Sequence, residues 1–371
     1  MSGIAIIGAG GFVGSRLIES LVLDGCTNVR AVVRSYRNIA AFCQYGDAVD
    51  TRLANAEDPV SLAAALEGAV VAVNLTTGPP SGIVKSTRAI LEACASAGVR
   101  RLVHLSSAVV YGDVTEPVGD DDPPVARHWM PYARAKAESE RWLLGQIERQ
   151  HDVEIIVLRP GIVWGVRSPH TLAFAQSLAA KNAFLSGDAS GIFNGIYIDN
   201  LTSAIRTCCD CRRRVVGFFN VGDRETITWR DFFGAIGPAL DCDTRQLPTV
   251  SAEQFPWSVG AAVDAIQSMG PVNALYHRLK SHVPDGVKSA VKSRLEGAYL
   301  YERHAGAYAA RPSVSREQWH LQRVRHKLPT GKFERTFHHA PPVTFQEGVR
   351  RTLTWLAALG LVSPAFPQLN D

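Results

Sequence analysis

The stretch Gly-Ile-Ala-Ile-Ile-Gly-Ala-Gly-Gly-Phe-Val-Gly, residues 3–14, decides the fold of this chain. Its apolar run from Ile4 to Ile7 is typical of a strand covered on both faces of a sheet. Gly8, Gly11 and Gly14 follow, and the next residues have helical apolar spacing. Glycine lets backbone N–H groups approach a diphosphate, and a helix N-terminus carries partial positive charge. The stretch predicts a dinucleotide-binding turn, with a purely structural turn as the alternative.

Composition indicates an ordinary globular protein. The 371 residues are 46% hydrophobic and 20% charged, and the length favours two lobes that share one cleft. The first strand begins near the N-terminus and no apolar run is long enough to span a bilayer, so we expect a cytoplasmic protein without a signal peptide. The odd, scattered set of cysteines fits reduced thiols. Cys208, Cys209 and Cys211 are crowded but lack a second ligand pair, so no metal site is predicted.

Strand-like and helix-like segments alternate at short spacing through the first half of the chain. This pattern predicts an α/β fold with a doubly wound parallel sheet, in which function lies at the carboxyl ends of the strands. We expect a cofactor-binding domain over residues 1–165, to which a strand near 215–221 returns. Residues 166–371 should form mainly a smaller substrate lobe, with an atypical insertion at about 250–330. The expected strands are near 4–7, 29–33, 47–57, 70–75 and 101–105, and the expected helices cover 59–66 and 84–97.

Arg34 follows the second expected strand, where a dinucleotide fold meets the adenosine ribose. An acid at this point binds the 2′-hydroxyl of NAD, whereas an arginine suits the 2′-phosphate of NADP. Arg37 lies three residues further on and no acid is nearby, so the sequence favours NADP over NAD. The alternative is a pair of exposed arginines in a loop.

Tyr132 and Lys136 lie four residues apart at the start of an expected helix, and therefore share one face. A lysine ammonium beside a phenol should lower the pKa of the tyrosine toward neutrality, so that it can exchange a proton with an alcohol or a carbonyl. Ser107 follows the fifth expected strand and can donate a hydrogen bond to the same substrate oxygen. The pattern predicts an acid/base site made by these three residues.

With these motifs the sequence resembles the extended short-chain dehydrogenase/reductase family, which includes NAD-dependent epimerases, dehydratases and reductases. The resemblance implies a catalytic Ser107, Tyr132 and Lys136. It also implies a cofactor site formed by Gly8, Gly11, Phe12, Val13, Gly14, Arg34, Asn55, Ala56, Leu75, Thr76, Tyr132, Lys136, Pro160 and Val163. It rests on Gly-Ala-Gly-Gly-Phe-Val-Gly at 8–14, Leu-Ser-Ser-Ala-Val-Val-Tyr-Gly at 105–112, Tyr-Ala-Arg-Ala-Lys at 132–136, Leu-Arg-Pro-Gly-Ile-Val-Trp-Gly at 158–165 and Tyr-Ile-Asp-Asn-Leu at 197–201.

The chain departs from the pattern of this family at three points. Asn55-Ala56 stands where many members have Asp-Leu or Asp-Val over the adenine, and the Asn55 carboxamide can still accept a hydrogen bond from the exocyclic amine. Ala89 stands where the family often has an asparagine, so water or backbone would have to replace that side chain. Ala108, Val109 and Val110 follow Ser107 in place of the Thr-Asp-Glu set of sugar 4,6-dehydratases, which argues against that reaction.

Positive charge gathers near the insertion. Residues 276–335 hold 13 Lys or Arg and 5 Asp or Glu, while the whole chain has a formal net charge of +4. Helix-like patterns at about 256–269 and 287–295 favour a lid or packing helix. The alternatives are a peripheral membrane contact through residues 256–335 and a homodimer contact. No nucleic-acid partner is predicted.

Together these features predict an NAD(P)-dependent oxidoreductase or epimerase that transfers hydride reversibly at a sugar carbonyl or alcohol of a small-molecule substrate, with a nucleotide sugar preferred. One alternative is a 3β-hydroxysteroid-like or other lipid alcohol dehydrogenase. The other is a catalytically silent NADP-binding regulator.

Overall fold

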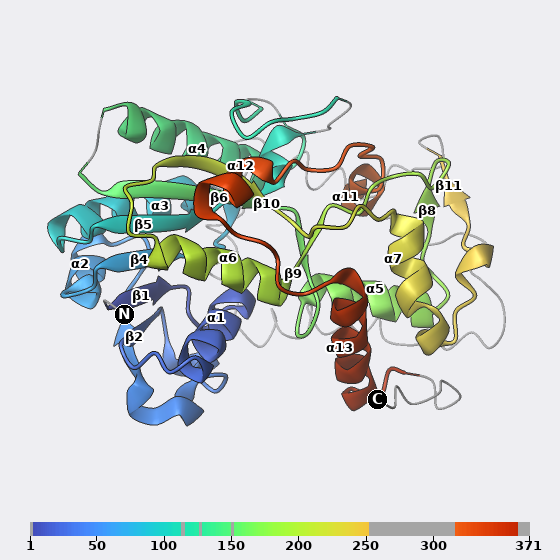
Figure 1. Ribbon diagram of the computed structural model, residues 1–371, viewed down its shortest axis with the longest axis horizontal. Helices are drawn as coiled ribbons and strands as arrows, with labels where there is room; N and C mark the ends of the chain where they lie inside the picture. The colour runs from blue at the N-terminus through green and yellow to red at the C-terminus, as the bar shows by residue number, and fades with distance from the viewer. Residues whose placement is uncertain (1–2, 113–115, 126–127, 150–151, 252–315, 363–371) are drawn as a thin grey trace, which may run out of the picture.

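A seven-stranded sheet forms the centre of the molecule (Figure 1). The computed structural model describes residues 3–112, 116–125, 128–149, 152–251 and 316–362. The strand order is β10-β6-β5-β4-β1-β2-β3 and all neighbouring strands run parallel, which confirms the doubly wound class. The strands are β1 (Ile4–Ile7), β2 (Val29–Val33), β3 (Val49–Leu53), β4 (Val71–Asn74), β5 (Arg101–Leu105), β6 (Glu154–Pro160) and β10 (Gly217–Val221).

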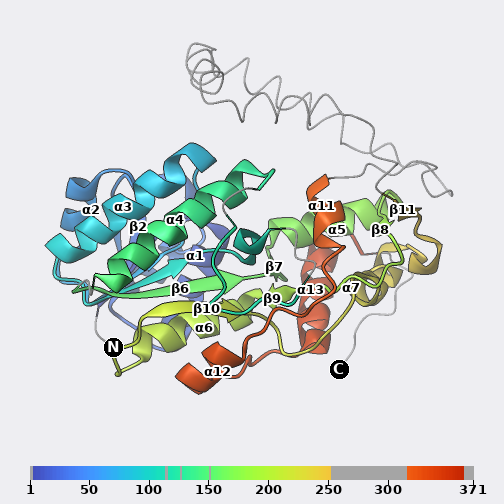
Figure 2. The same ribbon diagram turned by 90° about the horizontal axis from the view of Figure 1, so that it is seen from above.

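Helices cover both faces of this sheet, so its strands are apolar on both sides. Figure 2 shows α2, α3 and α4 above the sheet and α6 and α12 below it. Helix α1 packs in the same buried apolar cluster as α6 and α12. The bounds of these helices are α1 (Phe12–Leu23), α2 (Pro59–Leu66), α3 (Pro80–Ser96), α4 (Pro131–Glu148), α6 (Ile198–Asp210) and α12 (Gly331–Phe337).

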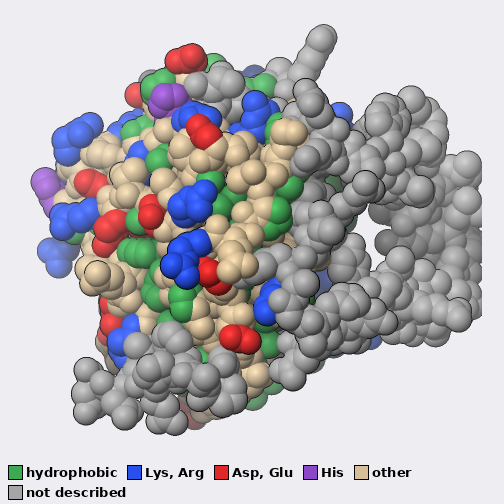
Figure 3. Space-filling model, turned by 90° about the vertical axis from the view of Figure 1, so that its right-hand side faces the viewer, with side chains coloured by type: hydrophobic (Ala, Val, Ile, Leu, Met, Phe, Trp, Pro, Cys, Tyr) green, Lys and Arg blue, Asp and Glu red, His purple; other side chains and the backbone are tan. Residues whose placement is uncertain are grey.

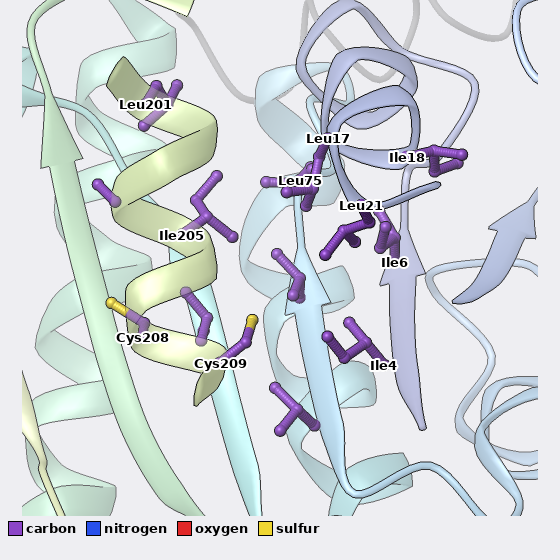
Figure 4. Packing of buried hydrophobic residues seen from close by; sticks show 14 of the residues in the cluster. Ile4, Ile6, Leu17, Ile18, Leu21, Leu75, Leu201, Ile205, Cys208 and Cys209 are labelled. Atoms are coloured by element: carbon purple, nitrogen blue, oxygen red, sulfur yellow. The ribbon is translucent and has the colours of Figure 1, made fainter. Parts of the chain in front are cut away.

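The packing of α1 and α6 on the sheet explains why the first strand is so apolar. Leu17 and Leu21 of α1 and Ile205 of α6 point toward the sheet, in which strand β1 carries Ile4 and Ile6 (Figure 4). All these side chains are almost fully buried. Burial of each such side chain contributes about 1.5–3 kcal/mol, so this layer holds the glycine-rich turn above it in place.

Strand β10 connects the late part of the chain to the sheet. It pairs with β6 in parallel, with Gly217 opposite Ile156, so the strand expected near 215–221 does join the first five. Apart from α6 and α12, which pack on the sheet, the segments between β6 and β10 and those after β10 form a second lobe around an aromatic core. Its other elements are β7 (Ile162–Trp164), α5 (Pro169–Ala179), β8 (Leu185–Ser186), β9 (Gly195–Tyr197), α7 (Trp229–Ile236), β11 (Thr249–Val250), α11 (Arg316–Leu321) and α13 (Phe345–Ala358).

Tightly packed rings make this second core rigid. Trp164 lies 4.9 Å from Tyr197 and 5.6 Å from Phe232, centroid to centroid, in edge-on contacts. The indole N–H of Trp164 donates to Asp223 Oδ2 at 2.6 Å, and Asn200 Nδ2 donates to Asp223 Oδ1 at 2.6 Å. Such edge-on pairs stabilise a core beyond simple burial of apolar area.

One predicted boundary was wrong. The helix expected to begin at residue 84 begins at Pro80, with Pro79 as its N-cap. Proline suits the first turn of a helix because it lacks only an N–H group that would have no helical partner there.

The helices expected at 256–269 and 287–295 lie outside the described residues, as does most of the basic stretch 276–335. In the described part of the face shown in Figure 3, basic and acidic side chains are intermixed. Within the described ranges, no helix combines the length and apolar character needed to cross a bilayer.

Candidate active site

A pocket of about 490 Å³ lies where the sheet meets the second lobe. It opens at the carboxyl ends of β4, β5 and β6, the place where open parallel sheets bind ligands. It brings together residues that are far apart in the sequence. Those that the sequence predicted and the pocket wall contains are Gly11, Phe12, Val13, Gly14, Leu75, Thr76, Ser107, Tyr132, Lys136, Pro160 and Val163.

The glycine-rich turn is closed so tightly that side chains have no room. Gly8 has a φ of +88°, and a Cβ there would lie 3.0 Å from the carbonyl carbon of Leu75. A Cβ on Gly14 would lie 2.5 Å from the oxygen of Gly8. Gly11 is the N-cap of α1 and provides no side-chain cap. The first N–H groups of α1 therefore face a cradle of bare backbone, which suits a diphosphate.

Ser107 and Tyr132 reach the pocket from two different elements. Ser107 caps the short 3₁₀ helix Ala108–Tyr111, and its Oγ accepts a hydrogen bond from the N–H of Val109 at 3.3 Å. Its own hydroxyl hydrogen thus remains free to be donated to a substrate oxygen. Tyr132 lies in the first turn of α4, directly after Pro131.

Lys136 lies one helical turn beyond Tyr132. Its Nζ is 6.0 Å from the centroid of the Tyr132 ring and donates to the carbonyl of Leu105 at 2.8 Å. The lysine is almost completely buried. This burial lowers the pKa of Lys136 to about 8, although the neighbouring Glu140 carboxylate acts in the opposite direction.

The prediction that Lys136 lowers the pKa of Tyr132 was wrong. Burial raises the pKa of Tyr132 to about 12, and the negative charge of Glu317 adds to this rise. The physical reason is that burial disfavours the charged phenolate of Tyr132. The Lys136 ammonium, 6.0 Å from the ring centroid and hydrogen-bonded to Leu105, does not offset this cost. At neutral pH the phenol therefore holds its proton.

Four of the predicted cofactor residues lie outside the pocket wall. Gly8 lies beneath it, in the turn. Arg34 is exposed just beyond β2. Asn55 is exposed and Ala56 half-buried in the loop after β3, where Asn55 Oδ1 accepts a hydrogen bond from the N–H of Glu57 at 3.2 Å.

The sequence did not predict one wall of the pocket, which comes from two distant segments. His128, Trp129 and Met130 precede α4, and Glu317 and His320 lie on α11. The Trp129 and His320 rings are 5.2 Å apart, centroid to centroid, and join the two segments. No local pattern marks these residues as partners, because their contact depends on how the chain returns after residue 315. The same segment supplies Leu321, Val324, His326, Lys327 and Leu328.

A buried ion pair supports the site from behind. Arg159, next to Pro160, donates to Glu140 from Nε at 2.9 Å and from Nη2 at 2.7 Å. Its Nη1 donates to the hydroxyl of Tyr111 at 2.8 Å. Glu140 lies one turn beyond Lys136, so the pair connects the helix that carries the lysine to the strand that ends at the pocket.

Within the described ranges, no cluster of three or more His, Cys, Asp or Glu side chains could hold a metal ion. Cys208 and Cys209 are buried at the end of α6, and Cys211 is half-buried. Burial raises the pKa of the Cys208 thiol well above its usual value, so this group is not poised as a thiolate ligand.

Comparison with known proteins identifies similar sequences and folds. Residues 8–169 match the NAD(P)H-binding family model. The human sterol-4-alpha-carboxylate 3-dehydrogenase, decarboxylating, is 26% identical over 53% of this chain and 54% of its own length. The UDP-glucose 4-epimerase of Vibrio cholerae is 26% identical over 66% of this chain and 78% of its own. A dTDP-glucose 4,6-dehydratase double mutant from Streptomyces venezuelae has a TM-score of 0.66 at 18% identity, over 95% of this chain and 96% of its own.

The chain thus spans about half the length of the human relative, and the structural match shows a common fold across nearly the whole chain. The matched residues include the glycine-rich turn, Ser107, Tyr132 and Lys136. By its motifs, its fold and these relatives, the chain is similar to the extended short-chain dehydrogenase/reductase family, and its residues 8–169 match the NAD(P)H-binding family model.

Proposed function

We propose that this protein transfers hydride reversibly between NAD(P) and a secondary alcohol or ketone. The observation that carries the proposal is that Ser107, Tyr132 and Lys136 line the same pocket as the glycine-rich turn. A proton donor, a hydroxyl donor and a cation are thus gathered beside a dinucleotide cradle. This is the set that carbonyl reduction and alcohol oxidation require.

The bare backbone at Gly8, Gly11 and Gly14 fits the diphosphate of the cofactor, and Pro160 and Val163 form an apolar wall suited to the nicotinamide. When bound, NAD(P) supplies the hydride acceptor or donor. The chain itself provides orientation and proton transfer. Lys136, whose Nζ donates to Leu105, has further N–H groups available for the ribose hydroxyls.

The protonation state of Tyr132 at neutral pH favours reduction of a carbonyl over oxidation of an alcohol. With a pKa of about 12 the phenol is protonated at neutral pH and can donate to a carbonyl oxygen that becomes an alkoxide. Ser107 donates a second hydrogen bond to that oxygen. In the reverse direction, the phenol must first lose its proton, so oxidation should require more alkaline conditions.

NADP is the cofactor we propose in preference to NAD. Arg34 is exposed at the end of β2 and leaves its guanidinium available for a 2′-phosphate. In the part of β2 and its following turn that the structure describes, no carboxylate stands in the place of the ribose-binding acid of NAD enzymes.

The substrate class has two candidates. A nucleotide sugar is supported by the epimerase relative, which covers two thirds of this chain. A lipid alcohol is supported by the sterol dehydrogenase relative and by apolar residues of the pocket wall, including Met130, Val324 and Leu328. A catalytically silent regulator has less support, because all three catalytic side chains are present. The cytoplasmic location, the homodimer, the membrane contact through residues 256–335 and the domain division near residue 165 stay predictions.

Tyr132→Phe tests the proposed reaction. The variant keeps the ring but removes the proton, so turnover of a ketone substrate should fall by about 10²-fold or more while NADPH affinity stays unchanged. Tyr45→Phe is the control, since Tyr45 packs against the core and lies outside the pocket wall. Retention of near-normal turnover by Tyr132→Phe, measured as loss of NADPH absorbance, would show that Tyr132 is not the acid.

A further inference from the structure

We propose that Glu317 is a specificity-determining residue, which selects substrates with a neutral hydrogen-bond donor beside the reacting carbon and disfavours those with an anionic group there. The proposal rests on the proposed hydride transfer and adds the chemistry of the substrate around the reacting centre. Glu317 belongs to none of the sequence motifs, and helix α11 places it in the pocket wall.

Helix α11 is held firmly against the second lobe. The indole N–H of Trp319 donates to the carbonyl of Val250 at 3.2 Å. Directly after the helix, Gln322 accepts from the N–H of Ser186 at 2.8 Å and donates to the carbonyl of Phe184 at 3.1 Å. Gln322 is almost fully buried. These bonds fix the short helix, so the fold sets the backbone position of Glu317 at the pocket wall.

The charges around the pocket make Glu317 unusual. Among the described residues of the wall it is the one acidic side chain, and the wall contains no arginine. The two lysines are both engaged with backbone carbonyls. Lys136 donates to Leu105 at 2.8 Å, and Lys327 donates to the carbonyl oxygens of Asp223 at 2.7 Å and Glu225 at 2.5 Å. The remaining titratable groups of the wall are Tyr111, Tyr132, His128, His170, His320 and His326.

The pocket wall that contains Tyr132 also contains Glu317. Its charge is the one that adds to the burial-induced rise in the pKa of Tyr132. The same field acts on any substrate group next to the carbon that faces Tyr132. A carboxylate or phosphate at that position would be repelled, whereas a hydroxyl or an ammonium could donate to the Glu317 oxygens.

The two candidate substrate classes both contain molecules that this rule separates. UDP-glucose and UDP-glucuronic acid differ by a carboxylate near the reacting sugar carbon. A 3β-hydroxysterol and its 4α-carboxylate differ in the same way. In each pair we expect the neutral member to bind more tightly.

The experiment measures dissociation constants of all four molecules by calorimetry, with the cofactor-saturated protein at pH 8. It compares wild type with Glu317→Gln and with Glu92→Gln, an exposed control on α3 outside the pocket wall. Glutamine keeps the shape and the hydrogen-bond acceptor but removes the charge. Because Glu317 is exposed and its field is screened, the neutral-to-anionic preference should shrink by about threefold or more in Glu317→Gln. Glu92→Gln should leave it unchanged.

Tighter binding of the anionic member in the pair that binds, or a preference unaffected by Glu317→Gln, would overturn the proposal. Binding, unlike turnover, does not depend on Tyr132 as the acid. If Tyr132→Phe keeps its turnover while Glu317→Gln still loses discrimination, the reaction assignment fails and the role of Glu317 stands. If Tyr132→Phe loses its turnover while Glu317→Gln keeps the preference for the neutral ligand, the reaction assignment stands and the proposed role of Glu317 is rejected.

Discussion

Removal of Arg159 should destabilise this protein far more than removal of an exposed arginine. The Arg159 and Glu140 side chains are 2% and 0% exposed, and Arg159 donates to the Glu140 carboxylate from Nε at 2.9 and 3.2 Å and from Nη2 at 2.7 Å. Arg159→Met keeps an aliphatic side chain of similar length, but it removes the guanidinium that lies 4.8 Å from the centroid of the Phe218 ring and leaves the Glu140 carboxylate buried without its counter-charge. Breaking one side of such a pair costs about 3–5 kcal/mol. This is a large part of a typical total stability of about 5–15 kcal/mol.

The assay is urea unfolding followed by tryptophan fluorescence, with the slope m as a check that the transition stays two-state. The matched control is Arg350→Met, whose partner Glu347 lies one turn away on the surface of α13, where the arginine side chain is 55% exposed. This control should lose little stability, because water and salt screen an exposed ion pair. The double variant Glu140→Leu/Arg159→Met removes both charges and should recover at least about 2 kcal/mol relative to Arg159→Met.

The reasoning is refuted if Arg159→Met is no less stable than Arg350→Met. It is also refuted if the double variant is at least as unstable as Arg159→Met, because the loss would then come from packing and not from an unpaired charge. A confirmed result would explain how α4 and β6 are kept in register behind Lys136 and Pro160.

Two further predictions concern charge at the site. Arg34→Asp places a carboxylate where a 2′-phosphate would bind, so the ratio of NADP to NAD affinity should reverse; tighter binding of NAD by wild type would show that Arg34 is only a surface residue. The pKa of Lys136 is about 8 in the folded protein, against an ordinary value of 10.5 in the unfolded chain, so the unfolded chain binds one more proton between these values and stability should rise with pH there. Relative to Lys136→Met, wild type should gain about 2 kcal/mol between pH 8 and 9.5 in urea unfolding, and an equal pH response of the two proteins would contradict this.

The sequence by itself determined the sheet and the cofactor end of the site, because both depend on local patterns. Strand-length apolar runs alternate with helical spacing, and a parallel sheet covered by helices buries every such run on both faces. The glycines of residues 8–14 are required by a turn that leaves no space for a Cβ. Tyr132 and Lys136 share a face because one helical turn separates them. These features need no knowledge of distant contacts.

Only the tertiary structure decided the substrate side of the pocket and the behaviour of the groups in it. Glu317 shares the pocket wall with Tyr132 because the fold brings α11 to the pocket, and no sequence spacing encodes that placement. The pKa of Tyr132 moves upward because burial outweighs the nearby ammonium, and burial is a property of the whole fold. The pairing of Glu140 with Arg159 likewise joins two segments whose closeness arises only when α4 packs on β6.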